Sequence, residues 1–436
     1  MFTKEELLEK YKNLPMSIEF PDQMQNPNST IKIYEGEFEI VRTDKAEKVF
    51  GVINLKWLPN IDVEFEVKIP TTGGFLGLEC NLSEELTIKI NDFDAGQIRI
   101  SHQSLKMPEN QIELRGYFTK GIVLGDNSVE VQTIRFAVPN LRKLTGASDF
   151  RDEERVYFSQ RITLDANDYV IKLDRVSNYE KLEKELDKSG GFAITHIGEA
   201  ISVKKQFAKE SVKIIQDELR LFLSFLNGSK TSLISTHGIF EDKSVWREYR
   251  NTVVDTYKYV QSWLPKYDSS DLENLYKMFY ELFKKDGCKD FLQTVVHWYN
   301  SANTGAGAIE GSIVLAQTAL ELIFNWWIVE QKKMILGEDS KDLSASNKIR
   351  LILTQLNQSS DIPNHYRGLK DVVRNTGETQ DAPEAITQIR NAIVHSHKEK
   401  RKKLKDISVD AKFFALQMSI WYIELSLLKI LEYNGK

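Results

Sequence analysis

The sequence is poor in cysteine, since Cys80 and Cys288 are the only two among 436 residues. Two thiols so far apart in the sequence provide neither a disulfide framework nor a zinc knuckle. A reducing cytosol is therefore the simplest compartment. The first ten residues are charged and contain no apolar segment, so they do not resemble a secretory signal peptide.

Long hydrophobic runs are missing too. The most apolar stretch, residues 309–329, is interrupted by polar side chains that a membrane-spanning helix would avoid. These side chains are Glu310, Gln317, Glu321 and Asn325. We therefore expect a cytoplasmic protein with no membrane partner.

The chain also lacks an excess of positive charge. Its formal net charge is −5, with 41% hydrophobic and 28% charged residues, which is typical of a soluble globular protein. Such a charge gives no overall attraction to nucleic acid, so any nucleic-acid site must come from a local basic patch. A length of 436 residues predicts two or three domains.

Residues 1–15 predict a short helix that ends at Pro15, and from there to about residue 177 apolar and polar residues mostly alternate, as in the segments 61–69 and 129–136. A period of two is typical of strands with one face toward solvent, and short turns containing glycine separate these segments. We therefore expect a β-rich N-terminal domain over residues 1–177, built as a sandwich or a curved sheet. Residues 178–268 are mixed and predict an α/β connecting region packed on that domain.

The period changes to that of a helix in residues 269–436, which predicts a C-terminal all-α domain. The fold class expected is therefore α+β. Helices are expected over 271–285, 289–302, 306–336, 345–357, 382–397 and 408–433. The 306–336 helix is apolar on much of its surface, so it is expected at the centre of a bundle.

The segment from Arg390 to His395 brings together residue types that can act on a phosphate group. A histidine titrates near neutral pH and can act as a base or an acid. An arginine stays charged and binds two phosphate oxygens with its planar fork. Asn391 can orient His395 or the scissile phosphate. Five residues of ideal helix amount to a rotation of about 140°, so Arg390 reaches His395 only by its long side chain, by a distorted helix end, or across a dimer interface.

An arginine, four residues and a histidine, with Asn391 directly after the arginine, resemble the motif of the HEPN ribonuclease superfamily. The order of the helices over 269–436 is also similar to that family. Upstream, the segments 194–199 and 221–228 resemble the region that precedes the HEPN domain in ApeA-like bacterial anti-phage proteins.

This resemblance implies a metal-independent endoribonuclease without a cofactor, whose catalytic residues are Arg390, His395 and Asn391. It implies a homodimer through the HEPN domain, with the 382–397 helices near the twofold axis. It also implies abortive infection as the setting, an RNA substrate with tRNA among the candidates, and an N-terminal region that senses a phage-derived trigger or restrains the nuclease.

A basic run follows the motif, with six basic residues and one acidic residue between positions 398 and 405. Its candidate phosphate-binding residues are Lys398, Lys400, Arg401, Lys402 and Lys403. The alternative for this run is a solvated loop. For Arg390 and His395 the alternatives are a structural ion pair and an interaction with the helix dipole.

Two further functions stay open for the whole domain. One is a non-catalytic HEPN module that binds RNA or a protein, and the other is a HEPN partner of a nucleotidyltransferase. The chain shows no nucleotidyltransferase signature of its own, and His395 and His397 lack the further ligands that a zinc site needs.

Overall fold

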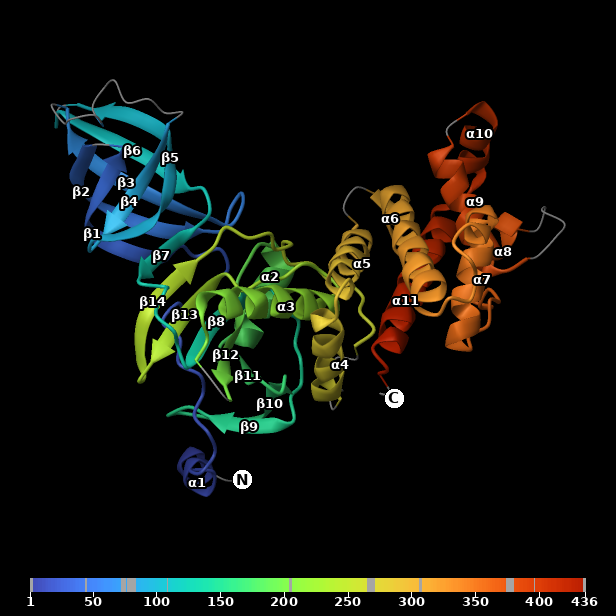
Figure 1. Ribbon diagram of the computed structural model, residues 1–436, viewed down its shortest axis with the longest axis horizontal. Coiled ribbons are helices and arrows are strands. Elements are labelled where there is room, and N and C mark those ends of the chain that lie inside the picture. The colour runs from blue at the N-terminus through green and yellow to red at the C-terminus, as the bar shows by residue number, and fades with distance from the viewer. Residues whose placement is uncertain are drawn as a thin grey trace. The chain divides into compact units, whose positions relative to one another are not determined.

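The protein divides into a β-rich unit and a helical unit in the computed structural model (Figure 1). The structure describes residues 3–43, 45–71, 76, 84–107, 109–203, 206–264, 271–305, 308–373, 380–395 and 397–433. The first unit comprises Met1–Leu223, Thr231–Tyr259 and Lys266–Glu273, and the second comprises Ser224–Lys230, Val260–Pro265 and Asn274–Lys436. A β-rich N-terminal region followed by a helical region confirms the α+β class.

Six antiparallel strands form a closed barrel at the start of the first unit, after the short helix α1 (Lys4–Lys10). They are β1 (Ile31–Arg42), β2 (Lys45–Lys56), β3 (Asp62–Pro70), β4 (Glu85–Ile90), β5 (Phe93–Lys106) and β6 (Gln111–Phe118), in the order β1-β2-β3-β6-β5-β4. Buried residues alternate with partly buried or exposed residues along β3 and β4, as the sequence predicts for strands with one wet face. The barrel closes through three residue pairs between β1 and β4, centred on Ile40 and Ile88. Closure removes the open edges that a curved sheet would leave.

A second sheet has eight antiparallel strands drawn from distant parts of the sequence. In spatial order they are β7 (Ile122–Gly125), β14 (Lys243–Tyr249), β13 (Ser235–Phe240), β8 (Thr133–Pro139), β12 (Ile194–Ser202), β11 (Tyr169–Arg175), β10 (Val156–Asp165) and β9 (Ser148–Arg151). The segment 178–268, expected to connect two domains, contributes β12, β13 and β14 to this sheet. It also contains the helices α2 (Tyr179–Ser189) and α3 (Lys209–Asn227).

Helix α3 covers one face of this sheet. Gln216 donates a hydrogen bond to the hydroxyl of Thr236 on β13 (2.9 Å), and the Tyr169 hydroxyl on β11 donates one to Glu218 (2.7 Å). Residues two apart on a strand share a face, so the neighbours Ser235 and His237 lie on the opposite face.

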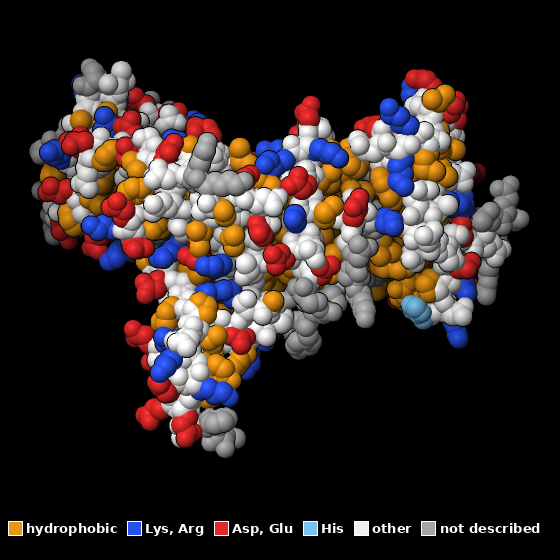
Figure 2. All heavy atoms as spheres, turned by 60° about the horizontal axis from the view of Figure 1, so that its bottom comes forward, with side chains coloured by type: hydrophobic (Ala, Val, Ile, Leu, Met, Phe, Trp, Pro, Cys, Tyr) orange, Lys and Arg blue, Asp and Glu red, His pale blue; other side chains and the backbone are white. Residues whose placement is uncertain are grey.

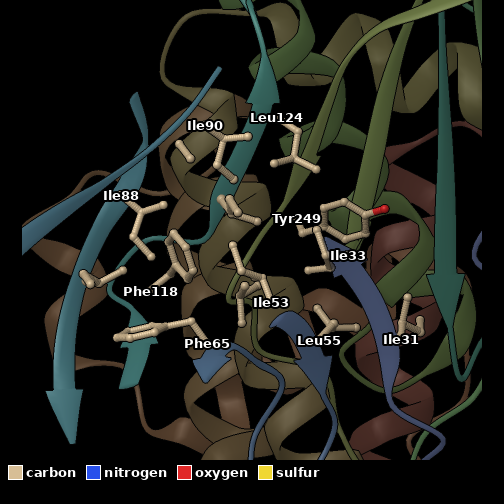
Figure 3. Packing of buried hydrophobic residues seen from close by; sticks show 14 of the residues in the cluster. Ile31, Ile33, Ile53, Leu55, Phe65, Ile88, Ile90, Phe118, Leu124 and Tyr249 are labelled. Atoms are coloured by element: carbon tan, nitrogen blue, oxygen red, sulfur yellow. The ribbon is translucent and has the colours of Figure 1, made fainter. Parts of the chain in front are cut away.

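The hydrophobic core of the first unit is continuous between the barrel and the second sheet. Figure 3 shows Leu124 and Tyr249, from β7 and β14, beside Ile33 and Ile53 of the barrel. Because the barrel and the sheet bury apolar side chains in one cluster, they form a single unit.

Residues 16–24, named here the N-terminal strap, cross the α3-free face of the second sheet. Arg161 donates two hydrogen bonds to Asp174 (2.7 and 2.6 Å) and one to the carbonyl oxygen of Met16 (2.7 Å). The backbone N–H of Ile18 donates to the same carboxylate (3.0 Å). Further along, the Phe20 ring stacks on His237 with centroids 4.6 Å apart. A buried charge is costly unless it is paired, and here Arg161 and Asp174 pair with each other. Their hydrogen bonds to the backbone of Met16 and Ile18 also hold the strap on the sheet.

Helices form the second unit: α4 (Leu272–Lys284), α5 (Cys288–Asn303), α6 (Ala308–Ile323), α7 (Ala345–Leu356), α8 (Arg367–Val373), α9 (Ala382–Val394), α10 (Lys398–Asp406) and α11 (Val409–Ile430). Helix α6 packs against α5, α11, α9 and α7, which confirms its expected central place. It continues as a π-helix, η1 (Phe324–Gln331), and a 3₁₀ turn, η2 (Asp339–Asp342), precedes α7. The expected 382–397 helix ends at Val394, and α8 and α10 are not among the helices that the sequence predicted.

Two segments are long and apolar enough to span a membrane by length and composition, Ala308–Gln331 and Val409–Ile430. Half or more of each apolar window is buried in the protein, and α6 and α11 pack on each other. Core helices of soluble proteins have the same character, which fits a soluble protein. On the face shown in Figure 2, basic and acidic side chains are interspersed.

Candidate functional site

Helix α9 begins at a strongly held N-terminus. The Asp381 side chain accepts a hydrogen bond from the backbone N–H of Glu384 (3.0 Å), and Pro383 lies in the first turn. Arg350 of α7 donates two hydrogen bonds to the same carboxylate, at 2.7 and 2.9 Å. An aspartate cap stabilises a helix by about 1 kcal/mol. The cap and the bidentate hydrogen bonds from Arg350 therefore define where α9 starts. Because Arg390 lies about two turns later on the same helix, they also fix its position.

Arg390 is partly buried on the penultimate turn of α9 and bonds to its neighbour. Its Nη1 atom donates a hydrogen bond to Oδ1 of Asn391 (3.1 Å). Its Nε atom is buried, with no hydrogen-bond partner in the described part of the chain. A buried donor without a partner costs roughly 1–3 kcal/mol. The guanidinium therefore keeps one donor unused inside the protein.

His395 lies just beyond the last residue of α9. Its backbone angles, φ −90° and ψ 80°, are not helical, and its N–H donates to the carbonyl oxygen of Asn391 (3.0 Å). Its side chain is exposed. The 140° separation of an ideal helix thus does not apply, because the chain leaves the helix at this residue. Within the described ranges, no hydrogen bond joins the side chains of His395 and Arg390.

The basic run expected to bind phosphate forms α10, a helix and not the solvated loop of the alternative interpretation. Lys403 donates a hydrogen bond to Gln388 of α9 (2.8 Å), and burial together with Lys400 lowers the pKa of its amine. Lys403 therefore holds α10 against α9. Lys398 and Lys402 are exposed, Lys400 is half-buried, and the side chain of Arg401 lies outside the described residues.

Several buried polar groups near α9 were not singled out by sequence reasoning. They lie on three helices that pack together, and each has an atom without a hydrogen-bond partner in the described part of the structure. These groups are Ser312 and Gln317 on α6, Thr387 on α9 and Tyr422 on α11. Thr387 lies three residues before Arg390 and therefore shares its face of α9. This spacing is the one feature of the sequence that could have pointed to any of these buried polar groups.

A metal centre has no basis in the described residues, because no group of three or more His, Cys, Asp or Glu side chains is placed to hold an ion there. Cys288 is a buried free thiol, and burial raises its pKa. Cys80 lies outside the described residues. The chemistry available at the end of α9 is therefore that of a guanidinium, a carboxamide and an imidazole.

Two parts of the chain match known families. Residues 126–260 match the family described as "YopA central domain", and residues 285–436 match "YopA C-terminal domain". These segments correspond to most of the second sheet and most of the helical unit. The chain is also similar to the "SPbeta prophage-derived uncharacterized protein YopA" of Bacillus subtilis (strain 168), at 28% identity over 416 residues, which is 94% of this chain and 91% of the relative. No solved structure matches the chain. The protein is thus similar to YopA over nearly its whole length.

Proposed function

We propose that the helical unit is a metal-independent endoribonuclease of the HEPN type, with Arg390, His395 and Asn391 as its site. One observation carries the proposal: the partly exposed side chain of Arg390 and the exposed imidazole of His395 lie at the same end of α9. An arginine that can grip phosphate and a histidine that can move a proton are the two groups that cleavage of RNA needs.

The proposed reaction uses the substrate's own nucleophile. His395 accepts the proton of the ribose 2′-OH, whose oxygen attacks the adjacent phosphorus. Arg390 binds the non-bridging oxygens and stabilises their growing negative charge. The bond to the 5′ oxygen breaks, and that oxygen takes up the proton that His395 accepted, which returns the imidazole to its neutral form. The products are a 2′,3′-cyclic phosphate and a 5′-hydroxyl, and the number of protons is unchanged.

A homodimer completes the proposed site. Three apolar side chains near the motif are exposed, namely Val394 on the last turn of α9 (43%), and Val409 (72%) and Phe413 (45%) on the first turns of α11. Helices α9 and α11 pack on each other, and exposed apolar side chains on neighbouring helices often mark an interface. Pairing through this surface brings Arg390 of one protomer toward His395 of the other.

Similarity to a prophage-derived protein supports a role in conflict between phage and host. In this proposal the enzyme acts in the cytoplasm during infection, and RNA cleavage halts the host before the phage matures. The β-rich unit then senses a phage-derived trigger or restrains the nuclease.

A second candidate function is a non-catalytic module that binds RNA or a protein, including a nucleotidyltransferase. The bond from Arg390 to Asn391, and not to His395, favours it, because an arginine occupied by its neighbour can serve recognition alone. The two functions differ in whether covalent bonds of RNA are broken.

The deciding experiment is phage challenge of cells that carry the wild type, Arg390→Ala or His395→Ala, with RNA ends sequenced after infection. His397→Ala is the matched control, because His397 is also exposed and two residues away. We expect new 2′,3′-cyclic ends in the wild type and the control alone. Equal protection by all four proteins without new RNA ends supports the non-catalytic module.

A further inference from the structure

A row of charged residues crosses the α3-free face of the second sheet. In the strand register, Lys172 pairs with Glu199, Glu199 with Arg135, Arg135 with His237, and His237 with Arg247. Directly opposed residues on neighbouring strands point to the same face, with Cβ atoms about 5 Å apart. Five strands thus place three cations, one carboxylate and one imidazole in line.

The residues of this row carry more positive than negative charge. Glu199 is shared between Lys172 (3.4 Å) and Arg135 (3.6 Å), and the Nε atom of Arg135 is buried without a hydrogen-bond partner in the described residues. The side chain of Arg247 makes no ion pair or hydrogen bond within the described part of the chain. Two arginines on either side of His237 therefore keep unused donors.

Arg135 and Arg247 both line a cavity of about 440 Å³. Arg135, His237 and Arg247 form its floor on the sheet, and the strap residues Phe20 and Pro21 form one wall. Pockets that hold small molecules have volumes of this order. Every one of these five residues belongs to the first unit.

His237 is held in a defined state beneath the cavity. Its Nε2 atom lies 3.0 Å from the Ser235 hydroxyl, which donates a hydrogen bond to Asp22 (3.1 Å). Because the Ser235 hydroxyl gives its proton to Asp22, its oxygen can only accept a hydrogen bond from His237, so Nε2 carries the ring proton. The other ring nitrogen, Nδ1, is then an acceptor. Burial and the two arginines hold the pKa of His237 down to about 3, so the ring is neutral near pH 7.

The cluster is not a hydrolytic triad, although it contains serine, histidine and aspartate. In a triad the carboxylate binds the ring nitrogen opposite the serine. Here Asp22 approaches the same nitrogen, Nε2, at 3.7 Å and also bonds to the serine. Ser235 is buried and is not among the residues that line the cavity, so a molecule in the cavity does not reach its hydroxyl.

We propose that this cavity binds a small phosphorylated hydroxyl compound, with its phosphate between Arg135 and Arg247 and a hydroxyl donating to His237. Arginine forks match phosphate oxygens, and charge-assisted hydrogen bonds are about twice as strong as neutral ones. Glu19 and Asp242 also line the cavity and repel a ligand that is anionic throughout. They accept hydrogen bonds from further hydroxyls, which is why a sugar phosphate fits better than a bare anion. This site is independent of the nuclease proposed above.

The test is titration calorimetry of the full chain in chloride buffer, with ribose 5-phosphate, inorganic phosphate and ribose as probes. We expect ribose 5-phosphate to bind more tightly than inorganic phosphate, and ribose not to bind. Arg247→Gln is expected to weaken binding of ribose 5-phosphate at least about tenfold. Arg99→Gln, at an exposed arginine of the barrel, is the matched control and leaves binding unchanged.

Arg135→Lys serves as a second variant if Arg247→Gln does not fold. It keeps the charge but loses the fork, so it weakens binding while the melting temperature stays near that of the wild type. The proposal is overturned if neither phosphate probe binds the wild type, or if inorganic phosphate binds as tightly as ribose 5-phosphate. Equal affinity in the wild type and in a folded Arg247→Gln or Arg135→Lys protein also overturns it.

Discussion

Arg390 bonds to Asn391, its neighbour on α9, at 3.1 Å, and makes no hydrogen bond to His395 in the part of the chain that the structure describes. Adjacent residues on a helix do not face each other, so the long arginine side chain turns back to reach the carboxamide. Asn391 thereby fixes the direction of one guanidinium nitrogen while Nε stays unused. In the proposed site, the hydrogen bond between Arg390 and Asn391 is therefore already formed, whereas the side chain of His395 is exposed.

Arg390→Ala and His395→Ala are each expected to abolish RNA cleavage and to change the free energy of unfolding by less than about 1 kcal/mol. His395 is exposed, and Arg390 already has a donor without a partner, so neither supports the core. Cleavage assays and thermal melts of the same preparations check this. A melting temperature that falls together with activity would mean that the residues are structural.

Asn391→Ala is expected to reduce cleavage by about tenfold, a smaller loss than that of Arg390→Ala. The carboxamide contributes one hydrogen bond of about 1 kcal/mol, which orients the guanidinium without replacing its charge. Single-turnover kinetics on a defined RNA measure the difference. If Asn391→Ala is as inactive as Arg390→Ala, the carboxamide acts on the substrate directly.

Val409→Asp is expected to convert the protein from a dimer to a monomer and to remove nuclease activity with it. A carboxylate at this exposed position must lose its water when the interface closes, which disfavours pairing. Light scattering gives the mass of the particle. Val253→Asp is the matched control, since Val253 is also 72% exposed and lies in the other unit. A wild-type monomer with full activity contradicts the proposed dimer.

Replacing Lys398, Lys400 and Lys402 with glutamine is expected to weaken RNA binding and to flatten its dependence on salt. Each lost contact with a single strand lowers the logarithmic slope by about 0.7. Lys403→Gln is expected instead to lower the melting temperature, because it removes the contact of α10 with Gln388. Filter binding at several salt concentrations distinguishes the two effects. An unchanged slope would identify the three lysines as solvated surface.

The first unit is expected to lose stability as the pH falls below about 6.5, the usual pKa of histidine. Burial lowers the pKa of His196 and of His237 to about 3, so the unfolded chain binds protons that the folded chain does not between these values. Stability therefore rises with pH in this window, with a slope of up to about 1.4 kcal/mol per pH unit for each histidine. Asp22 opposes this, because burial raises its pKa and the folded state holds its proton longer.

Melting curves between pH 7 and pH 4 for the wild type, His196→Asn and His237→Asn separate these contributions. Each variant removes one titrating ring and is expected to show a shallower decline. His102→Asn, at an exposed histidine of the barrel, is the control with an unchanged slope. If stability falls with pH as steeply in both buried-histidine variants as in the wild type, other groups cause the loss of stability.

The residue pattern alone was sufficient for the α+β class and for the approximate places of most helices, because period and capping are local properties. Asp381 and Pro383 mark the start of α9 in the sequence, and the structure caps that helix with Asp381. The alternation of residues along β3 likewise determines which side chains face the barrel interior.

Only the tertiary structure decided which strands pair and where the charged groups meet. Closure of the barrel depends on β1 pairing with β4, and the row from Lys172 to Arg247 joins strands that are far apart in the sequence. No local pattern encodes a pairing over such separations, since it follows from how apolar faces pack in three dimensions. The unused donor of Arg390 was likewise decided by the tertiary structure. Burial of its Nε atom depends on the packing of other helices around α9 and on no single neighbour in the sequence.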